Sequence, residues 1–191
     1  MNDLFPGEFG EMPRIETERL LLRKLKLGDA ADIFDYGQDP LVAKHVLWDP
    51  YRSVGEARGY IRYMQHKYRL YEPSSWGIEE KETGRIIGTI GYMWHQRENS
   101  SVEVGYSLAR RCWNRGYMTE ALDAVLRYSF ETLRLHRVEA QHETDNPASG
   151  RVMEKCGMKK EGILRERLYN KGRYVDVALY SILKKEYKPI K

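Results

Sequence analysis

The sequence predicts an α/β domain with one mixed, mostly antiparallel central sheet and helices on both of its faces. Segments with the two-residue period of strands alternate with segments of helical period. Two pairs of strand segments are joined by short hairpin-type turns, and one helix stands between two strands as in a parallel β-α-β unit. The 191 residues, 41% of them hydrophobic, supply enough apolar surface for one core.

The N-terminal part combines one expected strand with two helices. Residues 19–25 form an apolar run that suits a strand covered on both faces. The first helix begins at residues 28–29 and ends near Pro40, because proline cannot continue it. The second helix begins at a Ser53 cap and stops before Pro73.

The remaining segments are mostly strands. Their apolar patterns indicate strands at residues 76–78, 86–94, 101–108, 136–143, 161–169 and 173–183. Residues 117–133 keep one face apolar at helical spacing and are the clearest helix in the chain. A short helix starts at Asn146, its expected cap, and is closed by Gly157. Residues 14–187 are expected to form a single domain, preceded by a flexible N-terminal arm at residues 1–13.

Charge and composition place few demands on partners. The formal net charge of +4 is mild and the charges are interspersed, so nucleic acid is not required as a partner. No segment approaches the roughly 20 apolar residues that span a bilayer, so no membrane partner is expected. Cys112 and Cys156 form no disulfide framework, and a reducing, cytoplasmic location is expected.

One loop has the properties of an anion site. Residues 109–116, Ala-Arg-Arg-Cys-Trp-Asn-Arg-Gly, are basic and lead into the helix at residue 117. The first N–H groups of a helix lack intrahelical partners, and the helix dipole adds positive charge there. Gly116 lets the backbone approach a phosphate without a Cβ in the way. Taken alone, the pattern is more typical of a turn than of a site.

Several motifs occur in order around this loop. They are Thr-Glu-Arg-Leu-Leu-Leu-Arg at 17–23, Val-Glu-Val-Gly-Tyr at 102–106, Trp-Asn-Arg-Gly-Tyr-Met-Thr-Glu-Ala at 113–121, Asn-Pro-Ala-Ser at 146–149 and Glu-Lys-Cys-Gly-Met at 154–158. In this combination the chain resembles the GNAT acetyltransferases over about residues 14–187. Within them it is most similar to the branch that acetylates the N-termini of ribosomal proteins. The resemblance implies the GNAT fold and acetyl-CoA-dependent N-acetylation.

The resemblance also implies where acetyl-CoA binds. In the superfamily, a loop of the form Gln/Arg-x-x-Gly-x-Gly/Ala holds the CoA pyrophosphate through backbone amides, and it aligns here with residues 113–118. Trp113 and Met118 depart from that pattern, whereas Gly116 keeps it. The implied contacts come from Asn114, Arg115, Gly116, Tyr117, Met118 and Thr119, and, along the pantetheine arm, from the backbone of Leu108 and Ala109.

Direct acetyl transfer needs a neutral amine, a donor to the oxyanion and a proton source for the thiolate. Glu103 is the candidate base, because strand alternation turns it away from its apolar neighbours and the family often has an acid on this strand; the alternative is a solvated strand residue. By resemblance, Asn146 and Ser149 reach the pantetheine and sulfur. Ser149 is the candidate proton donor. Lys155 is a candidate for the 3′-phosphate, although a solvated lysine is the simpler interpretation.

The acceptor stays open at this point. A protein or peptide N-terminus is the first hypothesis, a small amine (a polyamine, an amino acid or an aminoglycoside) the second, and a non-catalytic acetyl-CoA-binding module the third. Trp48, Trp76 and Trp94 are candidates for an acceptor groove. No metal is expected, because the five histidines form no ligand pattern, and both cysteines are expected to be structural. The C-terminal strands could pair two subunits into a homodimer.

Overall fold

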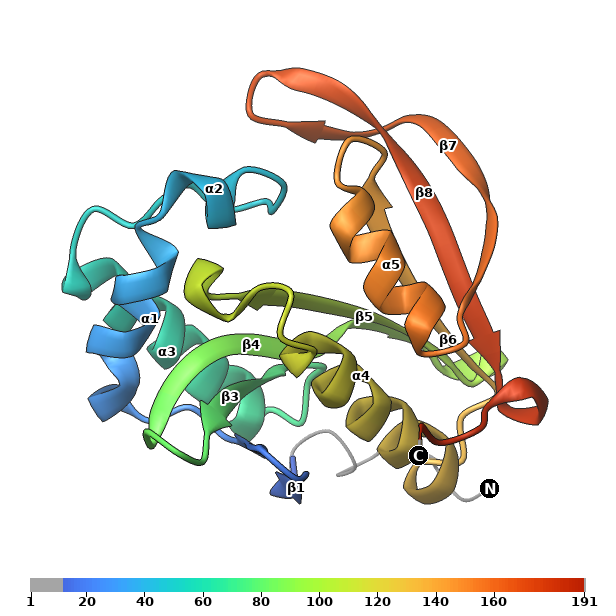
Figure 1. The fold of residues 1–191 in the computed structure, drawn as a ribbon, viewed down its shortest axis with the longest axis horizontal. Helices are drawn as coiled ribbons and strands as arrows, with labels where there is room; N and C mark the ends of the chain where they lie inside the picture. Colours follow the sequence, from blue (N-terminus) through green and yellow to red (C-terminus); the bar gives the residue numbers. More distant parts are fainter. Residues whose placement is uncertain (1–11, 191) are drawn as a thin grey trace.

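The computed structural model describes residues 12–190 and builds them on one eight-stranded sheet (Figure 1). The strand order is β1-β2-β3-β4-β5-β6-β8-β7, and neighbours are antiparallel except for β5 and β6. The strands are β1 Ile15–Glu16, β2 Leu20–Arg23, β3 Ser75–Glu80, β4 Arg85–Gln96, β5 Ser101–Leu108, β6 Arg137–Glu143, β7 Lys159–Asn170 and β8 Arg173–Leu183. The α-helices are α1 Ala30–Gly37, α2 Pro40–Ala43, α3 Val54–Arg69, α4 Tyr117–Arg127 and α5 Pro147–Lys155.

Helices cover both faces of the sheet, as the sequence predicts. Figure 1 shows α4 crossing in front of the central strands, while α3 lies behind them beside α1. On the α4 side, the hydroxyls of Tyr92 in β4 and Ser129 after α4 are 2.6 Å apart. On the α1 side, Asp32 accepts a hydrogen bond from the Ile86 N–H of β4 at 2.9 Å. Because both faces are buried, the central strands have continuous apolar runs in the sequence.

Most predicted elements are present, with two additions. The Ser53 cap is confirmed, since its hydroxyl accepts from the Glu56 N–H at 3.3 Å. Strand β1 and helix α2 were not predicted, because both are too short to show a period. Pro40 ends the first helix but occupies the first turn of α2, where Asp39 accepts from the Leu41 N–H at 2.9 Å. The predicted helix at 117–133 continues past α4 as a π turn, Tyr128–Thr132.

The folded part begins before residue 14. Residues 1–11 of the predicted arm lie outside the described residues. Met12 is buried with 4% of its surface exposed, and the Pro13 carbonyl accepts a hydrogen bond from Trp76 Nε1 at 2.8 Å. These two residues are therefore anchored to the core rather than part of a free arm, because the buried Trp76 indole requires an acceptor.

Strands β5 and β6 separate soon after they begin. Their parallel pairing runs from Ser101 opposite Arg137 to Glu103 opposite Glu139. Beyond that point β5 stays paired with β4 as far as Leu108, and β6 continues along β8. The carboxyl half of β5 is therefore open on its β6 side, next to the starts of α4 and α5.

The β7–β8 hairpin reaches across this opening toward α2 (Figure 1). At its tip, the Lys171 ammonium donates to the backbone carbonyls of Val46 at 2.6 Å and Trp48 at 3.1 Å. Strand β7 forms the edge of the sheet and is largely exposed, and the homodimer stays a prediction. Among residues 12–190, no helix is both long and apolar enough to span a bilayer.

Candidate functional site

A cavity of about 520 Å³ lies beside the open half of β5. Four segments line it: the end of α2 with the loop after it, the end of β5, the entrance of α4 and one face of α5. Most of the predicted acetyl-CoA ligands are in this lining, namely Leu108, Asn114, Gly116, Tyr117, Met118, Thr119, Asn146 and Ser149, together with Lys155. The structure therefore brings together residues that the sequence separates by as many as 47 positions (155 minus 108).

The entrance of α4 is formed by backbone groups. Gly116 is the N-cap residue with φ of +79°, and Asn114 is also left-handed with φ of +59°. The Glu120 N–H donates to the Gly116 carbonyl at 3.0 Å, so the amides of residues 117–119 precede the helical ladder. These amides and the positive end of the helix dipole suit a phosphate.

A partly exposed ion pair between Arg19 and Glu120 holds this entrance in place. The Glu120 carboxylate accepts hydrogen bonds from Arg19 Nε at 2.7 Å, the Arg19 N–H at 2.8 Å and the Thr17 hydroxyl at 2.6 Å. Arg19 also donates to the Arg115 carbonyl at 2.9 Å. Burial favours a raised pKa for Glu120, but these hydrogen bonds outweigh it and lower the pKa overall. The acid in the first turn is thus neutralised by Arg19 and does not repel an anion.

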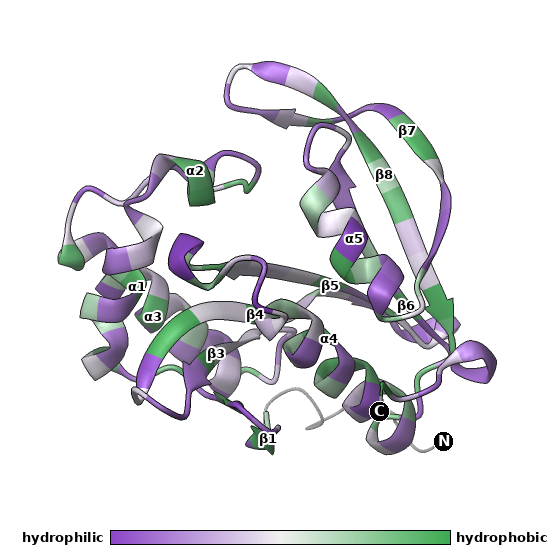
Figure 2. Ribbon diagram, in the orientation of Figure 1, coloured by the Kyte–Doolittle hydropathy of each residue, from purple (hydrophilic) through white to green (hydrophobic). Residues whose placement is uncertain are grey.

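The two arginines at the start of the loop face α1 instead of the cavity. Arg110 pairs with Asp39 at 2.8 Å and Arg111 with Asp35 at 3.0 Å. This turn has the hydrophilic colour in Figure 2. The basic character of the loop therefore serves mainly to dock it, and the cationic side chains on the cavity come from other segments: Lys44, Arg151 and Lys155.

Two predicted ligands do not line the cavity. Ala109 donates its N–H to the Ile87 carbonyl at 2.7 Å, and its own carbonyl accepts from the Cys112 N–H at 2.9 Å. The backbone groups of Ala109, one of the two residues expected to hold pantetheine, are thus already engaged in the sheet and the turn. The Arg115 guanidinium lies over the Tyr117 ring, 5.1 Å from its centroid. It packs along the loop surface instead of facing the cavity.

Ser149 meets a tyrosine from a different element. Its hydroxyl donates to the Tyr106 hydroxyl at 3.0 Å, and the Tyr106 hydroxyl donates to the Ser149 carbonyl at 3.1 Å. Burial raises the pKa of Tyr106, so the phenol stays protonated. Asn146 stands at the N-cap of α5 but makes no side-chain capping bond, which corrects the predicted cap. Its amide therefore remains available to the cavity, which it lines.

Glu103 lies apart from these residues. It lines a second cavity of about 410 Å³ together with Trp94, Glu139, Gln141 and Arg167. Its carboxylate accepts from Trp94 Nε1 at 2.5 Å and Gln141 Nε2 at 3.0 Å. Burial raises the pKa of Glu103, which makes it a stronger base than an exposed glutamate. Its catalytic role stays a prediction, and strand alternation places it on the face of β5 opposite Tyr106.

The tryptophans and cysteines differ in their positions. Trp94 lines the second cavity, whereas Trp76 is fully buried in the core and Trp48 stacks on Tyr51. Cys112 borders the first cavity, and burial raises its thiol pKa. Burial raises the pKa of Cys156 to about 12. Raised thiol pKa values disfavour the thiolate that a nucleophile requires.

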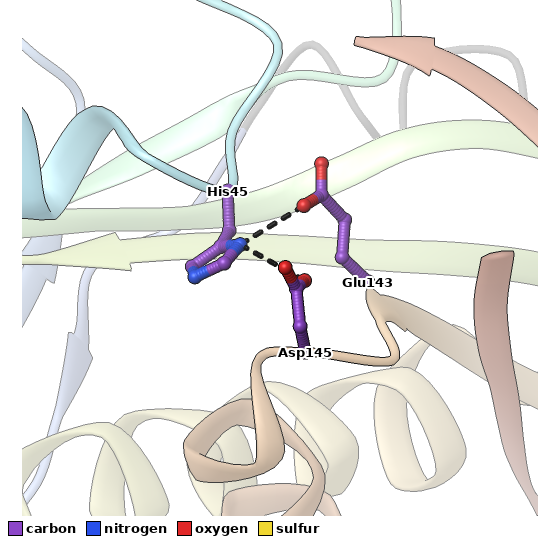
Figure 3. A group of neighbouring side chains, drawn as sticks. All are labelled: His45, Glu143 and Asp145. Carbon is purple, nitrogen blue, oxygen red and sulfur yellow. Dashed lines mark hydrogen bonds and ion pairs between the residues drawn. The ribbon is translucent and has the colours of Figure 1, made fainter. Parts of the chain in front are cut away.

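Sequence reasoning missed a histidine beside the first cavity. His45 Nδ1 lies 2.9 Å from Glu143 Oε2 and 3.4 Å from Asp145 Oδ1 (Figure 3). One ligand atom from each residue falls within 4.8 Å of the others, a spacing that a metal ion could use. Arg173, however, already contacts both carboxylates, at 3.3 Å and 3.1 Å. No local signal marks His45, since its partners are about 100 residues away, but Tyr106 could have been inferred from strand alternation.

Comparison with known proteins identifies the family. Residues 19–159 match the model of the acetyltransferase (GNAT) domain. An uncharacterized N-acetyltransferase p20 of Bacillus licheniformis is 37% identical over 92% of this chain and 99% of its own length. The ribosomal protein uS5-alanine N-acetyltransferase of Escherichia coli is 28% identical over 92% and 93%. The spermidine N(1)-acetyltransferase of Vibrio cholerae is 25% identical over 90% and 96%.

Solved structures agree with this result. A GNAT-family acetyltransferase from Bacillus anthracis superposes with a TM-score of 0.82 at 27% identity, covering 91% of this chain and all of that one. The family match begins just before β2 and ends at the start of β7, so it includes every residue that lines the first cavity. The chain therefore belongs to the GNAT family, and the protein is an acetyltransferase.

Proposed function

We propose that this acetyltransferase transfers the acetyl group of acetyl-CoA to the primary amine of a protein or peptide N-terminus. The observation that carries the proposal is the left-handed Gly116 at the entrance of α4, which opens onto the 520 Å³ cavity. Its free amides suit the CoA diphosphate, and Lys155 and Arg151 add positive charge for further phosphates. The uS5-alanine acetyltransferase among the relatives supports an N-terminal amine as acceptor.

The residues of the cavity fit direct transfer without a covalent enzyme intermediate. Acetyl-CoA supplies an activated thioester, and the amine attacks its carbonyl carbon. In this proposal Ser149 gives a proton to the departing thiolate, and the hydrogen bond between its hydroxyl and that of Tyr106 supports this role. Asn146 provides an uncommitted amide for the pantetheine arm. The cytoplasm is the proposed location.

The second cavity supports a role in holding the acceptor. Two carboxylates, Glu103 and Glu139, line it with Trp94, and such a surface favours a cationic ammonium group. Glu139 is paired with Arg137 at 2.6 Å, whereas Glu103 accepts hydrogen bonds from the neutral donors Trp94 and Gln141. Glu103 is therefore a candidate either to bind the amine or to deprotonate it.

A small cationic amine is the second candidate acceptor. The same carboxylates would suit a polyamine, and one relative is a spermidine N(1)-acetyltransferase. A non-catalytic CoA-binding module is the third hypothesis, and the Tyr106–Ser149 pair and the raised pKa of Glu103 weigh against it.

The proposal is tested by release of CoA thiol from acetyl-CoA against a panel of acceptors. The panel contains N-terminal peptides, polyamines, amino acids and aminoglycosides, and CoA binding is measured in parallel by calorimetry. Turnover selective for N-terminal peptides is the expected result. Selective turnover of a small amine would replace the acceptor class, and CoA binding without turnover of any amine would favour the binding module.

A further inference from the structure

His45, which lines the first cavity, interacts with the buried carboxylate of Glu143 (Figure 3). His45 Nδ1 lies 2.9 Å from Glu143 Oε2, and the Glu143 side chain is only 3% exposed. His45 belongs to the cavity lining, which Glu143 and Asp145 do not join. Because Nδ1 faces the two carboxylates, the ring edge that carries Nε2 is the part that borders the cavity.

The buried carboxylate is held from several sides. Asn170 Nδ2 donates to Glu143 Oε1 at 2.5 Å, and Arg173 contacts Oε2 at 3.3 Å. Glu143 ends β6, and its donors lie at the tip of the β7–β8 hairpin and at the start of β8. An anchored acceptor of this kind fixes the neighbouring imidazole with its proton on Nδ1 and a lone pair on Nε2.

Charged groups of both signs surround the ring. Glu143 and Asp145 contribute two negative charges, and Arg173, which contacts both carboxylates, contributes one positive charge. Desolvation opposes the charge on Asp145, but Arg173 and His45 outweigh it and lower the pKa of Asp145 overall. From the adjoining loop, Lys171 directs its ammonium at the Val46 and Trp48 carbonyls, and Lys44 lines the cavity beside the ring.

We propose that His45 Nε2 accepts the proton of the acceptor amine during acetyl transfer, and that Glu143 is the residue that positions the ring. The inference rests on the proposed function. The amine nitrogen forms a bond to the acetyl carbon, the carbon–sulfur bond breaks, and its electron pair leaves on the CoA sulfur. An acceptor that arrives as its ammonium form first gives one proton to Nε2, which passes it to solvent, and the neutral amine then attacks. The nitrogen loses a second proton to solvent as the amide forms, while the thiolate takes a proton from the Ser149 hydroxyl, which solvent restores.

A proton acceptor fits this cluster better than a metal ion. The three ligand atoms lie within 4.8 Å of one another, yet both carboxylates already accept from Arg173. A cation at Glu143 Oε2 would have to compete with that guanidinium, which contacts the same oxygen. Activity that is abolished by a chelator and restored by Zn²⁺ would overturn the proton-acceptor assignment.

The test compares His45→Gln with His66→Gln. His66 is an exposed histidine on α3 that is not part of the cavity lining. The kcat is measured from pH 6 to 10 at saturating acetyl-CoA and acceptor peptide. We expect the His45→Gln kcat at pH 7 to fall by about 10²- to 10⁴-fold, the usual contribution of a general base. The deficit should shrink above pH about 8, because an N-terminal amine then arrives uncharged. His66→Gln should match wild type.

Glu143→Gln and Asp145→Asn provide the test of positioning. Both variants retain Nε2, so each should show a smaller kcat loss than His45→Gln with the same pH trend. Asp145 is half exposed, so its variant should fold even if Glu143→Gln does not. CoA affinity, measured by calorimetry, should stay within about threefold of wild type in all variants, since the proposed role concerns the amine.

Three results would overturn the assignment. They are undiminished turnover of His45→Gln, a loss that is equal at every pH, and a loss that is matched by weaker CoA binding; the last two are the behaviour of a packing residue. Absence of wild-type turnover with every amine would overturn the proposed function and this inference together. That outcome is distinct, because the variants then have no activity to compare.

Discussion

Two parts of the first cavity are built in different ways. At the α4 entrance the lining residues are nearly contiguous in sequence, and the phosphate site proposed there consists of backbone amides. Elsewhere in the lining, His45, Tyr106 and Ser149 come from a loop, a strand and a helix, and Glu143 of β6 contacts His45. A site made of backbone depends on local dihedral angles, whereas a site made of side chains depends on the register of the whole sheet. The first kind tolerates side-chain replacement, and the second does not.

The largest expected effect is the difference in kcat between variants of the two candidate bases, His45 and Glu103. If the chemistry took place in the second cavity, the contrast between the two parts of the first cavity would not concern catalysis. We expect Glu103→Gln to lower kcat by less than about tenfold, against 10² or more for His45→Gln, because Glu103 already accepts from Trp94 and Gln141. Steady-state kinetics with an acceptor peptide measures both. Glu139→Gln is the matched control in the second cavity. A reversed ranking would assign the base to Glu103.

Substitution of Gly116 by valine tests whether CoA binding depends on the backbone conformation at the α4 entrance. Gly116 has φ of +79°, a conformation that costs an L-residue about 1–2 kcal/mol and a β-branched one more. We expect Gly116→Val to weaken CoA binding by about 10-fold or more in calorimetry. The control is Gly157→Val, which has φ of +80° at the end of α5 and should lose stability but not CoA affinity. Equal CoA affinity in both variants would exclude the entrance of α4 as the phosphate site.

Substitution of Glu120 tests whether the α4 entrance depends on the ion pair between Glu120 and Arg19. Because the pKa of Glu120 in the folded protein is below the ordinary 4.5, its contribution to stability is present above that pH and lost as the pH falls. We expect Glu120→Gln to lower the free energy of unfolding by about 1–3 kcal/mol at pH 7 and by little near pH 3. Thermal unfolding at several pH values measures this. The exposed Glu131 provides a control substitution, Glu131→Gln. A difference in the free energy of unfolding that did not change with pH would contradict a stabilising role for the Glu120–Arg19 ion pair.

Lys155 gives the smallest expected effect. It borders the cavity from an exposed position, where a single charge contributes about 0.5–1 kcal/mol, or two- to fivefold in affinity. We expect Lys155→Ala to weaken CoA binding by that factor and dephospho-CoA binding by less, with Lys160→Ala as control. Calorimetry with both ligands checks it. Equal losses for the two ligands would place the 3′-phosphate elsewhere.

The sequence predicted the parts of the molecule that depend on local pattern. The helices α3 and α4 and the strand β5 follow from periodicity and caps, and Gly116 stands at the entrance of α4 as predicted, although its left-handed conformation was not predicted. The docking of Arg110 and Arg111 on aspartates near α1 was not predictable, because charge alone does not say which partner a basic side chain meets.

The side-chain half of the site was predicted less completely. Ser149 and Asn146 were found by resemblance, and both line the first cavity. His45 was not predicted, because its partner Glu143 is distant in the sequence and only the tertiary structure brings His45 Nδ1 within 2.9 Å of Glu143 Oε2. Asn146 occupies the N-cap position of α5, as predicted. The predicted side-chain cap was wrong, because the Asn146 amide makes no hydrogen bond to the first turn of the helix.

The early separation of β5 from β6 has a consequence for ligand shape. A strand held along one edge by β4 is rigid, and alternate amides and carbonyls beyond Glu103 point toward the vacated β6 side. A flexible ligand that carries amide groups can form hydrogen bonds with these unpaired backbone groups, as an added strand would. Because the strand is already rigid, little conformational entropy of the protein is lost on binding. A purely aliphatic tail of equal length gains contact area but leaves those polar groups unmatched. If the proposed function is correct, the spacing of amide groups along the ligand should therefore affect its affinity as well as its phosphates do.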